Sequence, residues 1–163
     1  MQALDTAFPG NPLDEVGLGQ ADGLPGRLDK AGLLQGLVSP ILRARQTIAP
    51  IEAATGLSAT VDSGLREVLA ADLEMNTDAR SVACYVDTTR AWMAGRPACR
   101  IPGSPENGSD TLRRFDDVVR RIAEQTARMG DQAALVVSHG TALRLWTSLK
   151  AAPGGGVDPL WIA

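Results

Sequence analysis

The chain has 163 residues, of which 44% are hydrophobic and 21% charged, and its formal net charge is -3. These values are typical of one soluble globular domain, and the small net charge argues against a nucleic-acid or anionic-membrane partner. Two cysteines in a chain of this length do not form a disulfide framework, and one histidine cannot build a zinc site alone.

No apolar run in the sequence approaches the roughly 18 residues that a membrane-spanning helix needs. The chain starts with Met-Gln-Ala-Leu-Asp, which has neither the basic region nor the apolar core of a signal peptide. We therefore expect a cytoplasmic protein with no membrane contact, folded as a single domain over residues 1–163.

The first part of the chain has weak patterns and then one clear strand. Residues 1–13 contain the turn chemistry of a loop, and residues 14–29 are a weak helix candidate because glycine and proline interrupt them. Val16, Gln20, Leu24 and Leu28 would share one face of such a helix. Residues 33–38 form a short apolar run bounded by turn residues, which predicts a buried strand.

A helix is expected directly after that strand. Ser39 is a plausible N-cap and Pro40 a plausible first helical residue. The helix would extend from residue 41 to about residue 54, with Gly56 as its end and a kink caused by Pro50.

The middle of the chain alternates between short elements and loops. Alternating side chains at residues 57–61 give a modest strand signal. Residues 62–76 are predicted to be loop or short turns, residues 79–94 a helix, and residues 97–108 a loop rich in proline and glycine.

The last third carries the sharpest patterns. From Ser109 onward, apolar residues recur at helical spacing and predict the strongest helix of the chain. Residues 133–137 form a continuous apolar strand of the parallel kind that is buried on both faces. The strand ends at Ser138-His139-Gly140 and a helix resumes at residues 141–150. The tail from residue 153 is rich in glycine and then apolar.

Strands that alternate with helices predict an α/β fold, a three-layer αβα sandwich with a mostly parallel central sheet. In such sheets, ligands bind beyond the carboxyl ends of the strands. Two strand ends, at residues 39–40 and 138–140, open directly into helices. The free N–H groups and the positive dipole end of a helix N-terminus suit an anion such as phosphate.

Three residues could carry chemistry at these strand ends. His139 is either a structural histidine or a hydrogen-bond donor to a phosphoryl oxygen, with Gly140 permitting close approach of the ligand. Arg43 is either a solvated helix residue or a bidentate clamp for phosphate. Glu67 is either an exposed loop carboxylate or a general acid, whose pKa the negative charge of a phosphate pocket would raise.

Taken in order, these segments resemble the histidine phosphatase superfamily, also described as phosphoglycerate mutase-like. Residues 39–47 read Ser-Pro-Ile-Leu-Arg-Ala-Arg-Gln-Thr, close to the family's Ser-Pro-Leu-x-Arg-Ala-x-Gln-Thr motif. Residues 65–67 match the segment that bears the family's proton donor, and residues 136–140 match the strand that carries its second catalytic histidine. Gly108-Ser109 followed by Arg113 or Arg114 resembles the Gly-Glu-Ser…Arg stretch less closely.

By that resemblance, Arg43, His139 and Gly140 bind the phosphate of a small phosphorylated molecule. His139 would stabilise the charge on the transferring phosphoryl group, and Glu67 would protonate the leaving oxygen. Enzymes of this family need no metal or other cofactor, because arginines and histidines neutralise the phosphate in a fixed electrostatic environment.

The sequence departs from the family at its start. The family begins with an apolar strand that ends in Arg-His-Gly, whose histidine attacks phosphorus and becomes phosphohistidine. This sequence contains no Arg-His-Gly and only one histidine. By the resemblance the missing strand is central in the sheet, so its neighbours would lose ladder partners. We therefore expect a chain that is truncated at both ends and inactive, since loss of a covalent nucleophile costs orders of magnitude in rate.

Three interpretations follow. The favoured one is a shortened phosphatase that would hydrolyse a phosphomonoester through phosphohistidine, because the retained motifs show no decay. The alternative is a non-catalytic module in which Arg43 and His139 bind a phosphoester without turnover. A third is a degenerate chain that does not fold. Within the family, a phosphatase is favoured over a phosphoglycerate mutase-type phosphotransferase, which usually carries longer insertions.

Overall fold

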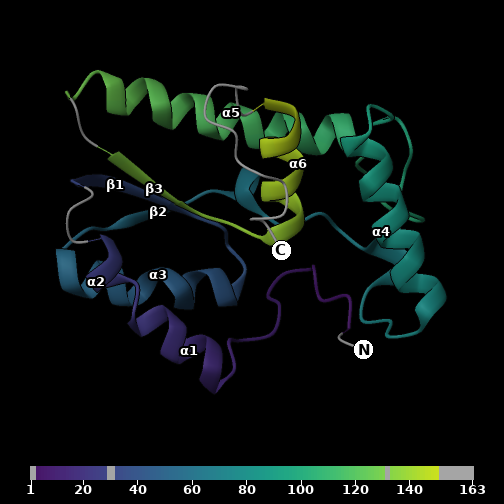
Figure 1. Ribbon diagram of the computed structural model, residues 1–163, viewed down its shortest axis with the longest axis horizontal. Coiled ribbons are helices and arrows are strands. Elements are labelled where there is room, and N and C mark those ends of the chain that lie inside the picture. The colour runs from purple at the N-terminus through teal and green to yellow at the C-terminus, as the bar shows by residue number, and fades with distance from the viewer. Residues whose placement is uncertain (1–2, 29–31, 131–132, 151–163) are drawn as a thin grey trace. The chain divides into compact units, whose positions relative to one another are not determined.

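The computed structural model describes residues 3–28, 32–130 and 133–150 (Figure 1). The chain divides into two compact units. The sheet unit is built from Phe8–Arg66 and Asp117–His139, and the helical unit from Met1–Ala7, Glu67–Asp116 and Gly140–Ala163. The predicted tail from residue 153 onward lies outside the described residues.

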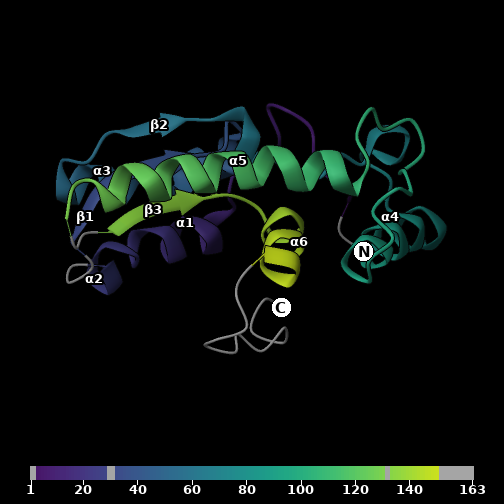
Figure 2. The same ribbon diagram turned by 90° about the horizontal axis from the view of Figure 1, so that it is seen from above.

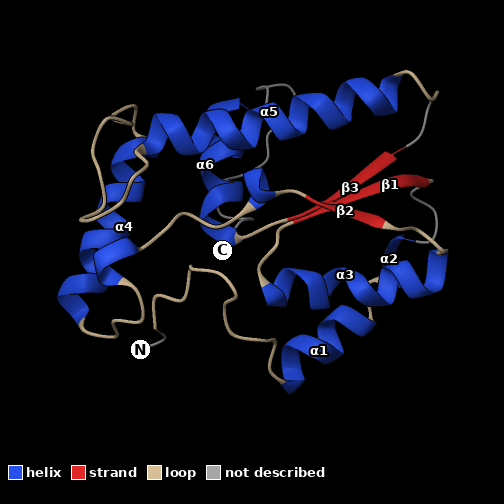
Figure 3. Ribbon diagram, turned by 180° about the vertical axis from the view of Figure 1, so that it is seen from behind, coloured by secondary structure: helices blue, strands red, loops and turns tan. Residues whose placement is uncertain are grey.

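The sheet unit contains three parallel strands in the order β2-β1-β3 (Figure 3). Their bounds are β1 Leu33–Val38, β2 Ala59–Val61 and β3 Ala133–Val137. Val38 pairs with Val61 on one side and with Val137 on the other, so the carboxyl ends of all three strands are in register. The sheet confirms the predicted α/β class, and every pairing among the described strands is parallel.

The central strand β1 and the outer strand β3 differ in how deeply their side chains are buried. Val38 of the central strand is fully buried, whereas all five residues of β3 are half-buried. The expectation that β3 is buried on both faces is therefore wrong for the described part of the chain. The physical reason is the strand order, because β3 pairs with β1 on one side and is an edge strand of the described sheet.

Helices cover both faces of the sheet. On one face lie α1 (Glu15–Asp22), α2 (Pro25–Leu28) and α3 (Leu42–Thr55) (Figure 1). On the other face, the half of α5 (Gly108–Ala127) that belongs to this unit runs along β3 (Figure 2). The sheet unit is therefore the predicted three-layer arrangement. Its core joins Val38 to Ala44 and Ile48 of α3, with Ala59, Leu135 and Val137 packed against them.

The start of α3 differs from the prediction. The helix begins at Leu42 with Ile41 in the N-cap position, and no side chain caps it. Ser39 is thus not the N-cap and Pro40 is not the first helical residue. The end agrees with the prediction, because Gly56 takes the left-handed conformation (φ 73°) that ends the helix.

The predicted single helix over residues 14–29 is also wrong, because this segment forms two helices, α1 and α2, and the four residues expected on one face do not share a helix. Val16 and Gln20 are exposed, and the buried residue of α1 is Ala21. Glycines within the helix weaken the apolar pattern, so the pattern does not identify the buried side. Asp14 caps this helix, because its side chain accepts a hydrogen bond from Gly17 N at 2.7 Å.

The helical unit has its own core. It contains α4 (Ala79–Met93), the first part of α5, α6 (Gly140–Lys150) and a short 3-10 helix at Ala71–Leu73, which agree with the predicted elements. Trp92 is 1% exposed at the centre of this core, and its Nε1 donates to the carbonyl of Cys99 at 2.9 Å. The other buried members are Val68, Ala70, Tyr85, Ile101 and Leu145.

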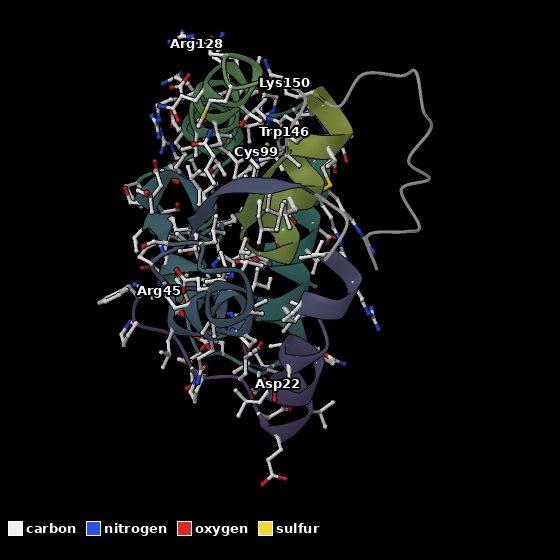
Figure 4. The ribbon with its side chains drawn as sticks, turned by 90° about the vertical axis from the view of Figure 1, so that its left-hand side faces the viewer. Asp22, Arg45, Cys99, Arg128, Trp146 and Lys150 are labelled. Carbon is white, nitrogen blue, oxygen red and sulfur yellow. The ribbon has the colours of Figure 1, made fainter. Side chains whose placement is uncertain are left out.

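Two side chains of α6, Trp146 and Lys150, which Figure 4 labels, bind Asp116 of α5. Trp146 Nε1 donates to Asp116 Oδ1 at 3.0 Å, and Lys150 Nζ lies 3.4 Å from Asp116 Oδ2. The ring of Trp146 also packs against Phe115, with 6.2 Å between ring centroids. Among the helices that the structure describes, none has the length and apolar character of a membrane span.

Candidate functional site

Two polar side chains meet at the carboxyl edge of the sheet. Ser39 follows β1 and His139 follows β3, and the strands pair directly. Ser39 Oγ lies 2.7 Å from His139 Nε2, a hydrogen bond between side chains that are 0% and 6% exposed. Ser39 Oγ also accepts from Ile41 N at 3.3 Å. The hydroxyl that the sequence assigned to a helix cap therefore fixes one nitrogen of the imidazole.

Backbone and side-chain bonds hold the neighbouring segments at this edge. Ser39 N donates to the carbonyl of Val137 at 3.0 Å, which extends the ladder between β1 and β3. Ser138 Oγ donates to the carbonyl of Leu65 at 2.7 Å. Since neighbouring residues of an extended chain point to opposite sides, Ser138 and His139 bind different partners.

Arg43 lies in the first turn of α3, where the sequence predicted it, and is half-buried. Leu42 N donates to the carbonyl of Pro9 at 2.9 Å, and Thr47 Oγ1 donates to the carbonyl of Arg43 at 2.8 Å. These bonds fix the backbone at the start of the helix. Arg43 and His139 thus follow the two paired strands of the sheet unit.

Glu67 belongs to the helical unit and is buried, with 8% of the residue exposed. Its carboxylate accepts hydrogen bonds from three backbone N–H groups, those of Val68 at 2.8 Å, Ala142 at 2.9 Å and Thr141 at 3.2 Å. Of the two interpretations left open by the sequence, the exposed loop carboxylate is therefore wrong.

The carboxylate of Glu67 occupies the N-terminus of α6. Thr141 and Ala142 belong to the first turn of that helix, whose N–H groups have no partner within the helix. A carboxylate is stabilised there by the N–H groups and by the helix dipole. The sequence predicted that N–H groups at this helix N-terminus suit phosphate. Two of them instead bind a carboxylate of the protein itself.

Arg114 holds the backbone of the same glutamate. Its Nη2 donates to the carbonyl of Glu67 at 3.0 Å and its Nε to Glu106 Oε2 at 3.0 Å. The side chains of Arg114 and Glu106 are 12% and 17% exposed. Arg113, by contrast, is 68% exposed and pairs only weakly with Asp110, at 3.6 Å. The sequence did not distinguish Arg113 from Arg114, because which of the two side chains is buried depends on the fold.

Tyr85 lies in the same unit as Glu67 and is 6% exposed. Its hydroxyl donates to the carbonyl of Val68 at 3.0 Å. Burial raises the pKa of this phenol well above its ordinary value, and the negative charge of Glu67 raises the pKa further. The tyrosine therefore stays neutral at any physiological pH. Among the described residues, no group of three or more His, Cys, Asp or Glu could hold a metal ion.

A comparison with protein-family models identifies the family. The model of the histidine phosphatase superfamily (branch 1) matches residues 8–156, which is most of the chain. The chain therefore belongs to the histidine phosphatase superfamily, as its motifs predicted. A comparison with curated proteins finds no match.

Solved structures of the same fold agree with this assignment. A structure described as mycobacterial hydrolase 2 is 25% identical with a TM-score of 0.74, and the match covers 93% of this chain and 66% of that chain. The mycobacterial glucosyl-3-phosphoglycerate phosphatase, in complex with inorganic phosphate, is 26% identical with a TM-score of 0.72, covering 94% and 74%. YhfR of Bacillus stearothermophilus shares the fold, with 24% identity, a TM-score of 0.70 and coverage of 94% and 72%. This chain thus spans about two thirds to three quarters of the length of these proteins.

Proposed function

We propose that this chain binds the phosphoryl group of a small phosphomonoester, within a family of phosphatases that form phosphohistidine. The observation that carries the proposal is the buried pair of Ser39 and His139 at the carboxyl edge of a parallel sheet, where α/β proteins bind ligands. A mycobacterial phosphatase of similar fold is known in complex with inorganic phosphate, which supports a phosphorylated ligand.

The roles that the resemblance implies are part of this proposal. Arg43 donates a fork of charge-assisted hydrogen bonds to phosphoryl oxygens, and His139 and Gly140 contribute further donors. The bond between Ser39 Oγ and His139 Nε2 orients the imidazole at this edge of the sheet. Glu67 protonates the leaving oxygen of the ester.

The number of histidines bears on whether this chain can hydrolyse a phosphomonoester as well as bind it. Formation of phosphohistidine needs an imidazole that attacks phosphorus while another stabilises the charge, and this sequence holds a single histidine. We propose that the residues of this chain bind phosphate and that they do not hydrolyse phosphomonoesters by themselves. Binding without turnover is also what the alternative interpretation, a non-catalytic module for phosphoesters, predicts.

The test measures binding and turnover on the same preparation. Calorimetric titration with inorganic phosphate should show saturable binding, which an Arg43→Ala variant weakens roughly ten- to a hundredfold, because a charge-assisted bond contributes about 1.5–3 kcal/mol. Arg45, an exposed residue of the same helix, supplies the matched control, Arg45→Ala. Equal phosphate affinity of the two variants would contradict the role of Arg43.

Turnover is measured with p-nitrophenyl phosphate in the presence of EDTA. We expect a rate no higher than that of the His139→Ala variant. Metal-independent hydrolysis that His139→Ala abolishes would contradict the proposed inactivity and assign the nucleophile to His139. Glucosyl-3-phosphoglycerate and 3-phosphoglycerate are the next two ligands to titrate, the first because of the similar mycobacterial enzyme.

A further inference from the structure

We propose that Arg114, held in place by Glu106, is the positioning residue that fixes Glu67. This proposal takes one point from the proposed function, namely that Glu67 is the proton donor. The geometry on which it depends lies entirely within the helical unit.

Glu67 is fastened at two points by different parts of the helical unit. Its carboxylate accepts from Thr141 N and Ala142 N at the start of α6. Its backbone carbonyl accepts from Arg114 Nη2 at 3.0 Å, on α5. Glu67 therefore connects two helices. Its carboxylate binds the start of α6, and Arg114 of α5 holds its backbone.

Glu106 holds the guanidinium in a single orientation. Its Oε2 accepts from Arg114 Nε at 3.0 Å, and the same oxygen lies 3.4 Å from the hydroxyl of Thr111, which is buried. A planar guanidinium that donates through Nε and Nη2 at once has little freedom to rotate. Both members of this ion pair are shielded from solvent, unlike Arg113 with Asp110, so screening by water is weaker here.

A proton donor in this position has a particular requirement. A proton donor must keep its place while it gives up and regains a proton, and three N–H groups hold the carboxylate of Glu67. Arg114 also binds the backbone carbonyl of Glu67. The arginine can therefore keep Glu67 in place while its side chain changes partners, which is the task of a positioning residue.

The test uses the amide N–H resonances of Thr141 and Ala142 in the full chain, which report directly on the carboxylate of Glu67. A Glu67→Gln variant gives the reference spectrum for a lost carboxylate. In Arg114→Gln, we expect both resonances to move at least halfway toward that reference, and hydrogen exchange of the two amides to become about five- to tenfold faster. Arg113→Gln is the matched control and should leave both resonances at the wild-type positions.

Two further variants keep the result interpretable. Arg114→Lys retains the charge but not the fork, and should recover only part of the wild-type spectrum. If Arg114→Gln does not fold, Glu106→Gln gives the same readout without removing the arginine, and a smaller shift of both amides is expected. A variant that melts at a lower temperature while both amides keep wild-type shifts and exchange rates would overturn the proposal, since Arg114 would then be merely structural.

Phosphate binding separates this proposal from the proposed function. Arg114→Gln should bind inorganic phosphate with wild-type affinity, because the residues proposed for binding are Arg43, His139 and Gly140. If the wild-type chain binds no phosphate, the proposed function fails, whereas the amide resonances still decide whether Arg114 positions Glu67.

Discussion

Ser39 and His139 are 100 positions apart in the chain, yet Ser39 Oγ lies 2.7 Å from His139 Nε2. Each residue directly follows a strand, and the two strands pair in parallel, so the sheet register brings the side chains together. Both residues are buried, with exposures of 0% and 6%. This pair couples the packing of the sheet to the orientation of the only histidine.

Substitution of Ser39 by alanine tests that coupling. The change leaves a buried ring nitrogen without its partner, which costs about 1–3 kcal/mol of the free energy of unfolding. Chemical denaturation measures this loss. The matched control is Ser58→Ala, because Ser58 is exposed and its substitution should change the free energy by less than about 0.5 kcal/mol. Equal effects of the two substitutions would show that the buried bond contributes nothing to stability.

The ionisation of Tyr85 gives a prediction about pH. Its pKa is raised in the folded protein, above all by burial, so the folded state favours the neutral phenol. The corresponding stability is fully present below the unfolded-state pKa of about 10 and is lost as pH rises above that value. Since Tyr85 is the only tyrosine, absorbance near 295 nm reports its ionisation alone. We expect tyrosinate to appear only together with unfolding.

The Tyr85→Phe variant provides the comparison. It should lose about 1 kcal/mol at neutral pH from the bond to the carbonyl of Val68, and its stability should fall less steeply between pH 9 and 11. A native protein that forms tyrosinate with an ordinary midpoint while still folded would show that the phenol is not buried.

Gly108 tests the packing of the helical core. A methyl group at this position would lie 2.5 Å from Trp92 Cγ, and the indole is 1% exposed. We expect Gly108→Ala to lower the free energy of unfolding by about 1–3 kcal/mol through overpacking. The opposite sign is expected for Gly19→Ala, because Gly19 lies inside α1 and the new methyl group would meet nothing within 4 Å beyond its chain neighbours and the backbone of its own helix. Thermal denaturation of both variants measures the difference, and a neutral Gly108→Ala would contradict the packing around Trp92.

Glu74 tests how the first described residues attach to the helical unit. Its Oε1 accepts from Thr6 N at 2.6 Å and from Ala7 N at 2.9 Å, and its Oε2 accepts from the hydroxyl of Thr6 at 2.5 Å. Thr6 Oγ1 in turn accepts from Ala70 N at 2.7 Å. Glu74→Gln leaves one acceptor oxygen in place of two and should cost about 1–2 kcal/mol. Hydrogen exchange at Thr6, Ala7 and Ala70 should accelerate more than exchange in α3. Uniform acceleration throughout the protein would instead indicate global destabilisation.

Strong local patterns made much of the fold predictable. Residues 33–38 and 133–137 are continuous apolar runs bounded by turn residues, and both are strands with the predicted bounds. The helical spacing after Ser109 predicted α5, in which Phe115 and Ile122 are buried. These signals depend on periodicity within one element, which a single sequence contains.

Contacts between distant segments could not be predicted in the same way. Local patterns predicted Ser39 only as a helix cap, because its bond to His139 depends on the register of two strands. It also could not choose between Arg113 and Arg114, since both fit the spacing and only the fold buries one of them. The half-burial of β3 likewise follows from strand order, which no local pattern encodes.

The imidazole spectrum of His139 during titration with inorganic phosphate decides whether this residue binds phosphate, because the single histidine gives an unambiguous signal. We expect a saturable shift of the ring resonances in the wild-type chain, and a midpoint in Arg43→Ala that is roughly ten- to a hundredfold higher. Ring resonances that stay unchanged up to saturating phosphate, in a protein whose amide spectrum shows that it is folded, would contradict phosphate binding at His139.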